Sequence, residues 1–392
     1  MKIVFFNESW IIGGSNKYFE SLIQVAIKEN HEVEYIINKE NRLVSESLKD
    51  KITVTKINVF NLVNKVNLVL QKYKYINSIF KVFIILNPII FIFNILQFVN
   101  LLRKRKVDLV ISCNGGYPGG ESCLSLILAS KLLNIKNILL VASMPQKRKK
   151  FTYPYEIFFD LLVDKSTSLL VACSRSQINS MQNLRGISGK RFEVLHNALN
   201  EEIKAEKIKK KGNDIVKLGT ISRIDKNKSI STLISAVSQL KNAGYKVFFE
   251  IIGDGPELKN LKRQSLKQGL TNNDILFRGF VEGDVDNYLV DFDIFLFSSL
   301  WEGLPFSILE AMKYKVPIIT SPSGGIEEAI IDNKTGIIVR ENLDYKFVNA
   351  IKMIIDNKDI SNSLATNAYE LFKKNFSAPV LHKNFKNILN SI

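Results

Sequence analysis

The chain has 392 residues, of which 46% are hydrophobic and 23% charged, and its formal net charge is +16. This length predicts two domains, or three, and the composition excludes a chain that is disordered over most of its length. The charge indicates an anionic partner, either a nucleotide, an acidic lipid surface or nucleic acid, unless it reflects only a Lys-rich proteome.

The cysteine and histidine content argues against a disulfide framework and a zinc site. Cys113, Cys123 and Cys173 form no CxxC pair, and their odd count fits a reducing compartment. The three histidines are too scattered to suggest metal ligands. The first residues, MKIVFFN, run directly into a strand-like stretch and lack the regions of a signal peptide. We therefore expect a cytoplasmic protein.

Short apolar, β-branched runs alternate with amphipathic stretches along the chain. Such runs suit strands that are buried on both faces, so they predict parallel sheets with helices on each side. They form two series and therefore predict two α/β domains. The first series is 3–7, 33–37, 52–59, 109–113, 138–142, 169–173 and 192–195, and the second is 216–221, 247–252, 275–277, 294–297, 317–320 and 336–339.

The polar stretch 200–213 separates the two series. It is rich in Lys and Glu and has no convincing apolar period, so we interpret it as a linker. The predicted domains are therefore 1–199 and 214–378. The last stretch, 379–392, is amphipathic and predicts a helix that packs back on the first domain.

Residues 82–102 form a mostly apolar segment, long enough for a transmembrane helix. Asn87, Asn94 and Gln97 fall on one side of a helical projection, and Pro88 interrupts the segment. Strands on both sides of the segment are expected in one sheet, and a single crossing would put them on opposite sides of a membrane. We therefore expect an amphipathic helix in the membrane interface, with a buried crossover helix as the alternative.

Two basic runs lie in the same predicted domain. Residues 103–106 follow the apolar segment directly, and residues 147–150 come later. Each cation near an anionic membrane contributes about 1 kcal/mol of attraction. We therefore predict peripheral contact with an anionic membrane through 82–106 and 147–150. Solvated charges beside a buried helix are the alternative.

A glycine pair follows the first predicted strand. Gly13 and Gly14 precede a helix, where glycine lets the backbone approach a ligand and the helix N-terminus offers free N–H groups. This arrangement predicts contact with a diphosphate or an acceptor. A simple tight turn is the alternative.

Cations and glycines follow the strands that open the second series. Arg223 and Lys228 lie in the loop after strand 216–221, at the edge of a parallel sheet where phosphates bind. Arg offers a planar fork of donors and Lys a point charge. Gly253 turns the chain after the next strand, before a helix expected to begin at Pro256. We expect Gly253 to shape the cleft, with a well-built turn as the alternative.

A pair of glutamates marks the most informative stretch. Glu302 lies in the loop after strand 294–297, and Glu310 lies eight residues later, in the second turn of a helix that begins near Leu304 and Pro305. Carboxylates accept hydrogen bonds from sugar hydroxyls, and a helix N-terminus attracts phosphate. The pair therefore predicts a ligand site. An acidic N-cap with an exposed helix glutamate is the alternative.

Another glycine pair opens the following helix. Gly324 and Gly325 come after strand 317–320, and Glu328 lies within the first turns of the helix behind them. Two successive helix starts that combine glycine with glutamate favour a ligand site over two unrelated turns.

Together these stretches resemble glycosyltransferase family 4, a group of retaining enzymes with the GT-B fold. The resemblance covers most of the chain and is sharpest over residues 218–339. The family's E-x7-E motif is matched by Glu302 and Glu310. Its GG-x-x-E motif is matched by Gly324, Gly325 and Glu328, and its pair of loop cations by Arg223 and Lys228. The segment VLHNALN, residues 194–200, is similar to the family's segment at the end of the first domain.

The resemblance implies an α/β protein of GT-B class, with two facing Rossmann-like domains, parallel sheets and an interdomain cleft. The first domain would bind the acceptor, and the second would bind the nucleotide sugar. Arg223 and Lys228 would neutralise the leaving diphosphate, and Glu302 would act with them on the donor sugar or phosphates. The donor-contacting residues expected are Gly13, Gly14, Gly253, Gly303, Leu304, Pro305, Phe306 and Glu310, of which Glu310 would bind the ribose.

No metal and no cofactor are expected beyond the nucleotide-sugar co-substrate, because two cations and helix dipoles can replace a metal. A UDP-sugar is favoured over a GDP-sugar. Three departures from the family are visible. The stretch where many members carry a first-domain histidine reads VASM at 141–144, Ser229 replaces a glycine after the lysine, and Lys315 stands where a glycine precedes the apolar-Pro step.

We therefore expect a metal-independent, retaining glycosyltransferase of hexosyltransferase type. It would transfer a sugar from a nucleotide sugar to a glycan or lipid-linked acceptor in bacterial surface polysaccharide biosynthesis, in the cytoplasm or at the inner face of the membrane. A sugar-nucleotide epimerase of the same fold is one alternative. A non-catalytic basic protein is another, but no basic stripe with interleaved aromatics is visible, so we expect no nucleic acid partner.

Overall fold

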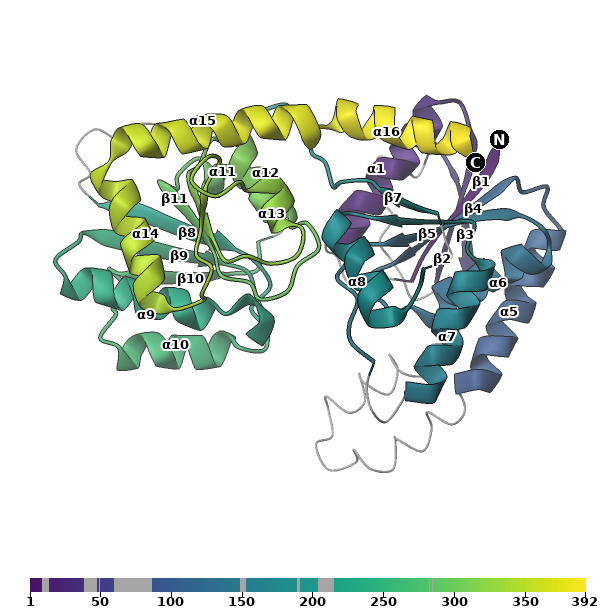
Figure 1. Cartoon of the computed structure of the whole chain (residues 1–392), viewed down its shortest axis with the longest axis horizontal. Coiled ribbons are helices and arrows are strands. Elements are labelled where there is room, and N and C mark those ends of the chain that lie inside the picture. Colours follow the sequence, from purple (N-terminus) through teal and green to yellow (C-terminus); the bar gives the residue numbers. More distant parts are fainter. Residues whose placement is uncertain are drawn as a thin grey trace. The chain divides into compact units, whose positions relative to one another are not determined.

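A computed structural model describes residues 1–8, 14–38, 48, 50–59, 87–148, 153–188, 191–203, 215–281, 283 and 285–392. The chain divides into two compact units (Figure 1). Unit 1 comprises Met1–Leu195 and His382–Ile392, and unit 2 comprises His196–Leu381. Each unit is an α/β structure built on one parallel sheet.

Within the described residues, unit 1 contains a seven-stranded sheet in the order β3-β2-β1-β4-β5-β6-β7. All of its pairings are parallel. The strands are β1 (Lys2–Asn7), β2 (Glu32–Asn38), β3 (Thr53–Ile57), β4 (Leu109–Asn114), β5 (Lys136–Val141), β6 (Leu169–Ala172) and β7 (Phe192–Val194). The helices are α1 (Gly14–Lys28), α5 (Asn87–Arg103), α6 (Glu121–Leu132), α7 (Tyr153–Ser166) and α8 (Arg175–Arg185).

Two neighbouring phenylalanines of β1 show why this sheet is covered on both faces. Successive side chains of a strand point to opposite faces. The ring of Phe5 packs edge-on against Phe19 of α1, with 5.4 Å between ring centroids. The ring of Phe6 packs against Phe98 of α5, at 5.2 Å. An uninterrupted apolar strand therefore serves two helical layers, as its sequence predicts.

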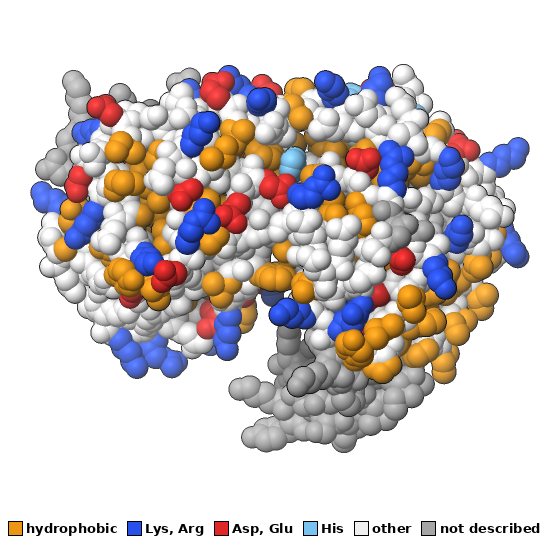
Figure 2. Space-filling model, viewed as in Figure 1, with side chains coloured by type: hydrophobic (Ala, Val, Ile, Leu, Met, Phe, Trp, Pro, Cys, Tyr) orange, Lys and Arg blue, Asp and Glu red, His pale blue; other side chains and the backbone are white. Residues whose placement is uncertain are grey.

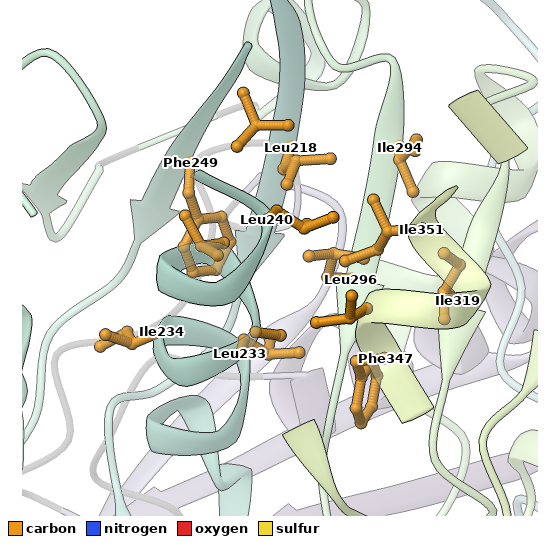
Figure 3. Close-up of a cluster of buried hydrophobic side chains, with 14 of the residues drawn as sticks. Leu218, Leu233, Ile234, Leu240, Phe249, Ile294, Leu296, Ile319, Phe347 and Ile351 are labelled. Carbon is orange, nitrogen blue, oxygen red and sulfur yellow. The ribbon is translucent and has the colours of Figure 1, made fainter. Parts of the chain in front are cut away.

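Unit 2 contains a six-stranded parallel sheet, counted over the described residues, in the order β10-β9-β8-β11-β12-β13. The strands are β8 (Val216–Ile221), β9 (Val247–Ile252), β10 (Ile275–Gly279), β11 (Ile294–Phe297), β12 (Ile318–Thr320) and β13 (Ile337–Ile338). The helices are η3 (Lys226–Lys228), α9 (Ile230–Asn242), α10 (Leu258–Lys267), α11 (Asp286–Leu289), α12 (Phe306–Lys313), α13 (Ile326–Ala329), α14 (Asp344–Asp356) and α15 (Lys358–Asn375). Figure 3 shows Leu233 of α9 and Phe347 of α14 meeting strand residues such as Leu296 in the core.

Every strand predicted from the apolar runs is present, with ends that differ by a few residues. One predicted helix start is wrong. Pro256 lies in a turn, and α10 begins two residues later, at Leu258. Of the predicted linker, residues 204–213 lie outside the described residues, and the two units divide between Leu195 and His196.

The last helix, α16 (Ala378–Ser391), begins in unit 2 and ends in unit 1. Glu29 at the end of α1 binds it twice, through His382 Nε2 at 2.6 Å and Lys386 Nζ at 2.7 Å. Arg191 Nη2 also donates to Ser391 Oγ, at 3.1 Å. The C-terminal residues therefore form part of unit 1.

Helix α5 differs from the amphipathic helix expected for this segment. Residues 82–86 lie outside the described residues. Within α5, Asn94 is buried rather than exposed, while Ile89 and Leu96 face solvent. Of the predicted polar side, Asn94 thus packs inward and Gln97 is partly exposed, while large apolar side chains face solvent. No helix in the described part of the chain is long and apolar enough to cross a membrane.

The two basic runs are not uniformly exposed. Arg105 is held by Glu34 of β2, with 3.0 Å between Nε and Oε1. Arg148 is held by Asp160 of α7, with 2.8 Å between Nε and Oδ2. Lys149 and Lys150 lie outside the described residues. These two arginines therefore bind carboxylates within the unit, and the membrane contact of the two runs stays a prediction.

Candidate functional site

The strand order of unit 2 reverses at β8, which lies between β9 and β11. The connections that leave β8 and β11 therefore run in opposite directions. Open parallel sheets bind ligands where neighbouring connections diverge in this way, in the crevice outside the carboxyl ends of the strands. The two loops at this position are residues 222–229 and 298–305. Arg223, Lys228 and Glu302, the three predicted catalytic residues, all lie in them.

Lys228 and Glu302 form an ion pair that joins the two loops. The ammonium group of Lys228 contacts Glu302 Oε1, and both side chains are largely buried. Ser299 Oγ donates to the same carboxylate oxygen at 2.6 Å. The ammonium group also lies 5.5 Å from the centroid of the Phe297 ring. A lysine held at several points in this way has a fixed charge position, which suits it to a phosphate.

Backbone contacts reinforce the junction of the two loops. The amide of Leu300 donates to the carbonyl of Asn227 at 2.8 Å. The side chain of Asn227 returns a hydrogen bond to the carbonyl of Trp301, also at 2.8 Å. Ser298 Oγ donates to the carbonyl of Lys228 at 2.8 Å. These bonds fix the position of one loop relative to the other.

Arg223 is oriented differently from Lys228. Its side chain is 62% exposed, and its Nε lies 3.8 Å from Oδ2 of Asp225. Among the described residues, no other ion pair of Arg223 is present. Arg223 is therefore in the predicted loop but apart from the Lys228–Glu302 pair, with its guanidinium open to an incoming anion.

The residues expected to contact the donor through their backbone lie between β11 and α12. Pro305 is the N-cap of α12 and has extended backbone angles, and Phe306 is the first helical residue. Gly303 accepts a hydrogen bond from the amide of Gly325, at 2.7 Å. The carbonyl of Leu304 accepts one from Asn197 Nδ2, at 2.5 Å. The loop is therefore supported from two other segments of unit 2.

Glu310 is buried in the second turn of α12. The alternative of an exposed helix glutamate is therefore wrong. Gly253 has a φ of 137°, and a Cβ atom there would lie 1.9 Å from the carbonyl oxygen of Ser222. No side chain fits this position, so Gly253 is required by the close approach of the β8 and β9 loops whether or not it contacts a ligand.

The second glycine pair lies beside the 298–305 loop, because the amide of Gly325 donates to the carbonyl of Gly303. Gly324 has a φ of 54°, and Gly325 is the N-cap of α13. Glu328 of α13 lies 3.0 Å from His196, measured between Oε2 and Nε2. The ring of His196 also packs edge-on against Phe376, at 5.2 Å between centroids. The segment that enters unit 2 from β7 thus holds the third loop of the site.

The two positions where the sequence departs from the family's glycines keep a left-handed backbone. Ser229 has a φ of 48° and Lys315 a φ of 53°. This region favours glycine and strains other residues. The backbone therefore keeps the conformation that glycine would adopt without strain, and the serine and the lysine adopt it with strain.

At the corresponding edge of unit 1, the strand order reverses between β1 and β4. Gly14 is the exposed first residue of α1, and Gly13 lies outside the described residues. Glu8 follows β1 directly, is buried and accepts a hydrogen bond from the amide of Ser122 at 3.2 Å. Burial, and then the charge of Glu8, raise the pKa of Glu121 to about 7.

The contacts of several of these residues could not be predicted from the sequence, although His196 and Asn197 lie in the segment 194–200 that resembles the family. Ser299 and Asn227 sit beside predicted residues and were detectable by their place in the same loops. His196 and Asn197 act across 132 and 107 residues of chain, which no local pattern reveals. Within the described residues, no three His, Cys, Asp or Glu side chains gather closely enough to hold a metal ion.

Comparison with known proteins gives this geometry a context. Residues 200–371 match the family described as glycosyl transferases group 1. An uncharacterized glycosyltransferase of Methanocaldococcus jannaschii is 27% identical over 78% of this chain and 81% of its own length. A capsular polysaccharide biosynthesis glycosyltransferase of Staphylococcus aureus is 25% identical over 57% of this chain and 58% of its own.

A structural relative confirms the fold class. The crystal structure of HepE from Anabaena in complex with UDP aligns over 100% of both chains, with a TM-score of 0.75 and 16% identity. The expected GT-B class, with two parallel-sheet α/β domains, is therefore correct. The family match and the curated relatives together support a glycosyltransferase, with a homologue in capsular polysaccharide biosynthesis.

Proposed function

We propose that the protein is a retaining glycosyltransferase that binds a nucleotide sugar at the β8/β11 edge of unit 2. The observation that carries the proposal is the fixed ammonium group of Lys228, held by Glu302 and Ser299 where the strand order reverses. Arg223 stands in the same loop with its guanidinium exposed. Two cations at this edge suit a diphosphate.

The two cations have complementary roles in this proposal. When the bond between the sugar and the diphosphate breaks, negative charge develops on the diphosphate oxygens. Lys228, held in position before the reaction, stabilises this charge without reorganisation, and Arg223 closes on the diphosphate from solvent. Loss of one such stabilising group costs about 2.7–4 kcal/mol of activation energy. Glu302 acts chiefly by positioning Lys228, since its Oε1 atom contacts that ammonium group.

Glu310 and the loop 303–306 complete the donor site of the proposal. Glu310, buried in α12, binds the ribose hydroxyls, and the backbone at the start of α12 contacts the donor. HepE of Anabaena was also solved in complex with UDP-glucose, which favours a UDP-sugar of hexose type as the donor here. The two cations supply the charge that a metal would otherwise supply, so transfer is metal-independent.

We place the acceptor on unit 1 and propose that it is a glycan or a lipid-linked sugar in surface polysaccharide biosynthesis. The relative in capsular polysaccharide biosynthesis supports this class of product. The reaction would take place in the cytoplasm, at the inner face of the membrane, with peripheral contact to anionic lipid.

The proposal is tested by incubating the protein with a panel of nucleotide sugars and lipid-linked acceptors, with and without EDTA. The expected product carries the anomeric configuration of the donor by NMR and forms equally well in EDTA. An inverted linkage would overturn retention, and loss of activity in EDTA that Mg²⁺ restores would overturn metal independence. Formation of an epimerised nucleotide sugar without acceptor would replace the transferase by an epimerase.

A further inference from the structure

Helix α5 exposes a continuous apolar stripe. Ile89, Ile92, Phe93 and Leu96 follow the helical spacing of one face, and each is between 46% and 64% exposed. The opposite side of α5 is apolar too, because Phe91 and Phe98 are buried in the core of unit 1. A helix of a soluble protein ordinarily has a polar outer face, so this stripe needs a partner or a function.

Helix α7 adds a second apolar stripe. Tyr153, Phe158 and Leu161 are each between 47% and 53% exposed. The two helices touch through Phe91 and Phe159, whose ring centroids lie 4.7 Å apart. Figure 2 shows hydrophobic side chains gathered at the lower right, where Figure 1 places α5 and α7. The α5/α7 face is defined as Ile89, Ile92, Phe93, Leu96, Tyr153, Phe158 and Leu161.

Two of the three carboxylates of α7 are buried. Glu156 is buried and binds Arg185 at 2.6 Å. Asp160 is buried and binds Arg148 at 2.8 Å. The remaining acid of the helix, Asp164, is half-buried. Both fully buried acids are thus neutralised by arginines inside unit 1.

Among the described residues of α5 and α7, the fully exposed charged side chains are positive. Helix α5 contains no acidic residue, and Arg103 and Lys104 at its end are exposed. Lys165 at the end of α7 is exposed as well. The guanidinium of Arg148 lies 5.8 Å from the centroid of the Tyr153 ring, and its charge is paired with Asp160. Apolar side chains with a cationic border match an interfacial membrane surface.

We propose that the α5/α7 face binds the surface of an anionic phospholipid bilayer, with Ile92, Phe93, Leu96 and Phe158 in the acyl boundary and the lysines and Arg103 at the headgroups. This face is a specific surface for the membrane contact of the proposed function. The proposal rests on that function only in that a lipid-linked acceptor would explain why the protein binds a membrane. It keeps Arg103 and Lys104 of the first basic run and adds the exposed stripe of α7 to the predicted contact.

The test is flotation of the full chain with phosphatidylcholine vesicles, with and without phosphatidylglycerol. The wild type is expected to float with the anionic vesicles, and the double variant Ile92→Ser/Leu96→Ser is expected to partition at least tenfold less. Phe158→Ser, on the other helix, should weaken partitioning in the same direction. Leu266→Ser is the matched control, because Leu266 is 73% exposed on α10 of unit 2; it should float as the wild type does.

Charge is tested separately from the apolar contact. Lys104→Glu/Lys165→Glu should reduce flotation with anionic vesicles, and added salt should do the same to the wild type. A wild type that stays in solution, or stripe variants that float as it does, overturns the proposal. A dimer in analytical ultracentrifugation that the stripe variants abolish would also overturn it, in favour of a second copy on this face. UDP binding by every variant should be unchanged, so failure here is distinguishable from failure of the donor site.

Discussion

The side chain of Asn197 donates a hydrogen bond of 2.5 Å to the carbonyl of Leu304, which lies in the loop before α12. Asn197 is buried, and within the described structure its Oδ1 has no hydrogen-bond partner. The residue stands just after the division between the two units. An asparagine at the entrance of unit 2 thus holds the loop that we assign to the donor.

Asn197→Ala leaves the carbonyl of Leu304 without its donor. We expect the free energy of unfolding to fall by about 1–3 kcal/mol, because a buried acceptor loses its hydrogen bond. We also expect the KM for the donor to rise more than kcat falls, since the donor loop loses its support. Both are measured by denaturant unfolding and steady-state kinetics. Asn367→Ala is the control, because that amide holds the carbonyl of Lys334 in an exposed position. A donor KM equal to that of the wild type would contradict the positioning role.

Lys228→Met removes the fixed ammonium group, and we expect kcat/KM to fall by about two to three powers of ten. Glu302→Gln keeps the shape and the hydrogen bond from Ser299 while it removes the charge that holds Lys228. If Glu302 positions Lys228, we expect kcat/KM to fall only about tenfold in Glu302→Gln. Equal losses in the two variants would instead assign Glu302 a direct role on the donor sugar.

Arg223→Ala is expected to abolish transfer. The protein should stay folded, because the side chain of Arg223 is 62% exposed. Glu310→Gln tests the ribose contact in the same assay and keeps the volume of a buried side chain. Circular dichroism of both variants checks that the fold is retained. Full activity in either variant would remove that residue from the proposed site.

Lys315 has a left-handed backbone, with a φ of 53°. Lys315→Gly and Lys315→Ala both remove the cation that lies 4.6 Å over the ring of Tyr369. The two variants therefore differ mainly in backbone strain, and we expect the glycine variant to be more stable by about 1 kcal/mol. Thermal unfolding of the pair measures the difference. An alanine variant as stable as the glycine variant would show that the strain is absent.

Glu121 gives the stability of unit 1 a specific pH dependence. Burial and the neighbouring Glu8 raise its pKa from 4.5 to about 7, so the folded state holds its proton over that window and the unfolded state does not. The stability from this group is complete below about pH 4.5 and is lost as the pH rises to about 7. Between pH 5 and pH 8, the free energy of unfolding of the wild type should fall by up to about 3 kcal/mol more than that of Glu121→Gln. Denaturant unfolding of both proteins at the two pH values measures this difference. Parallel curves for the two proteins would contradict the raised pKa.

The sequence predicted the fold well because its physical signals are local. Most strands are apolar, β-branched runs, and β11 matches its predicted ends of 294 and 297. The loops of the site are predictable for the same reason, since Lys228 and Glu302 lie in the loops that follow β8 and β11. What local pattern could not supply was the pairing of Asn197 with Leu304, which depends on how distant segments pack.

The surface of α5 shows a different limit. The helical projection identified a polar side that contains Asn94, and an isolated helix would turn that side to water. In the structure Asn94 is buried, and Ile89, Ile92 and Leu96 face solvent. Periodicity gives the relative positions of side chains around a helix, but the packing of unit 1 decides which side faces outward.

The most direct test of the account is isothermal titration of the wild type and Arg223→Ala with UDP, GDP, TDP and ADP. We predict that UDP binds the wild type, that the other nucleotides bind more weakly, and that Arg223→Ala weakens UDP binding at least tenfold, or by about 1.4 kcal/mol. Absence of binding by all four nucleotides, or equal binding by the variant, would contradict a donor site at the β8/β11 edge.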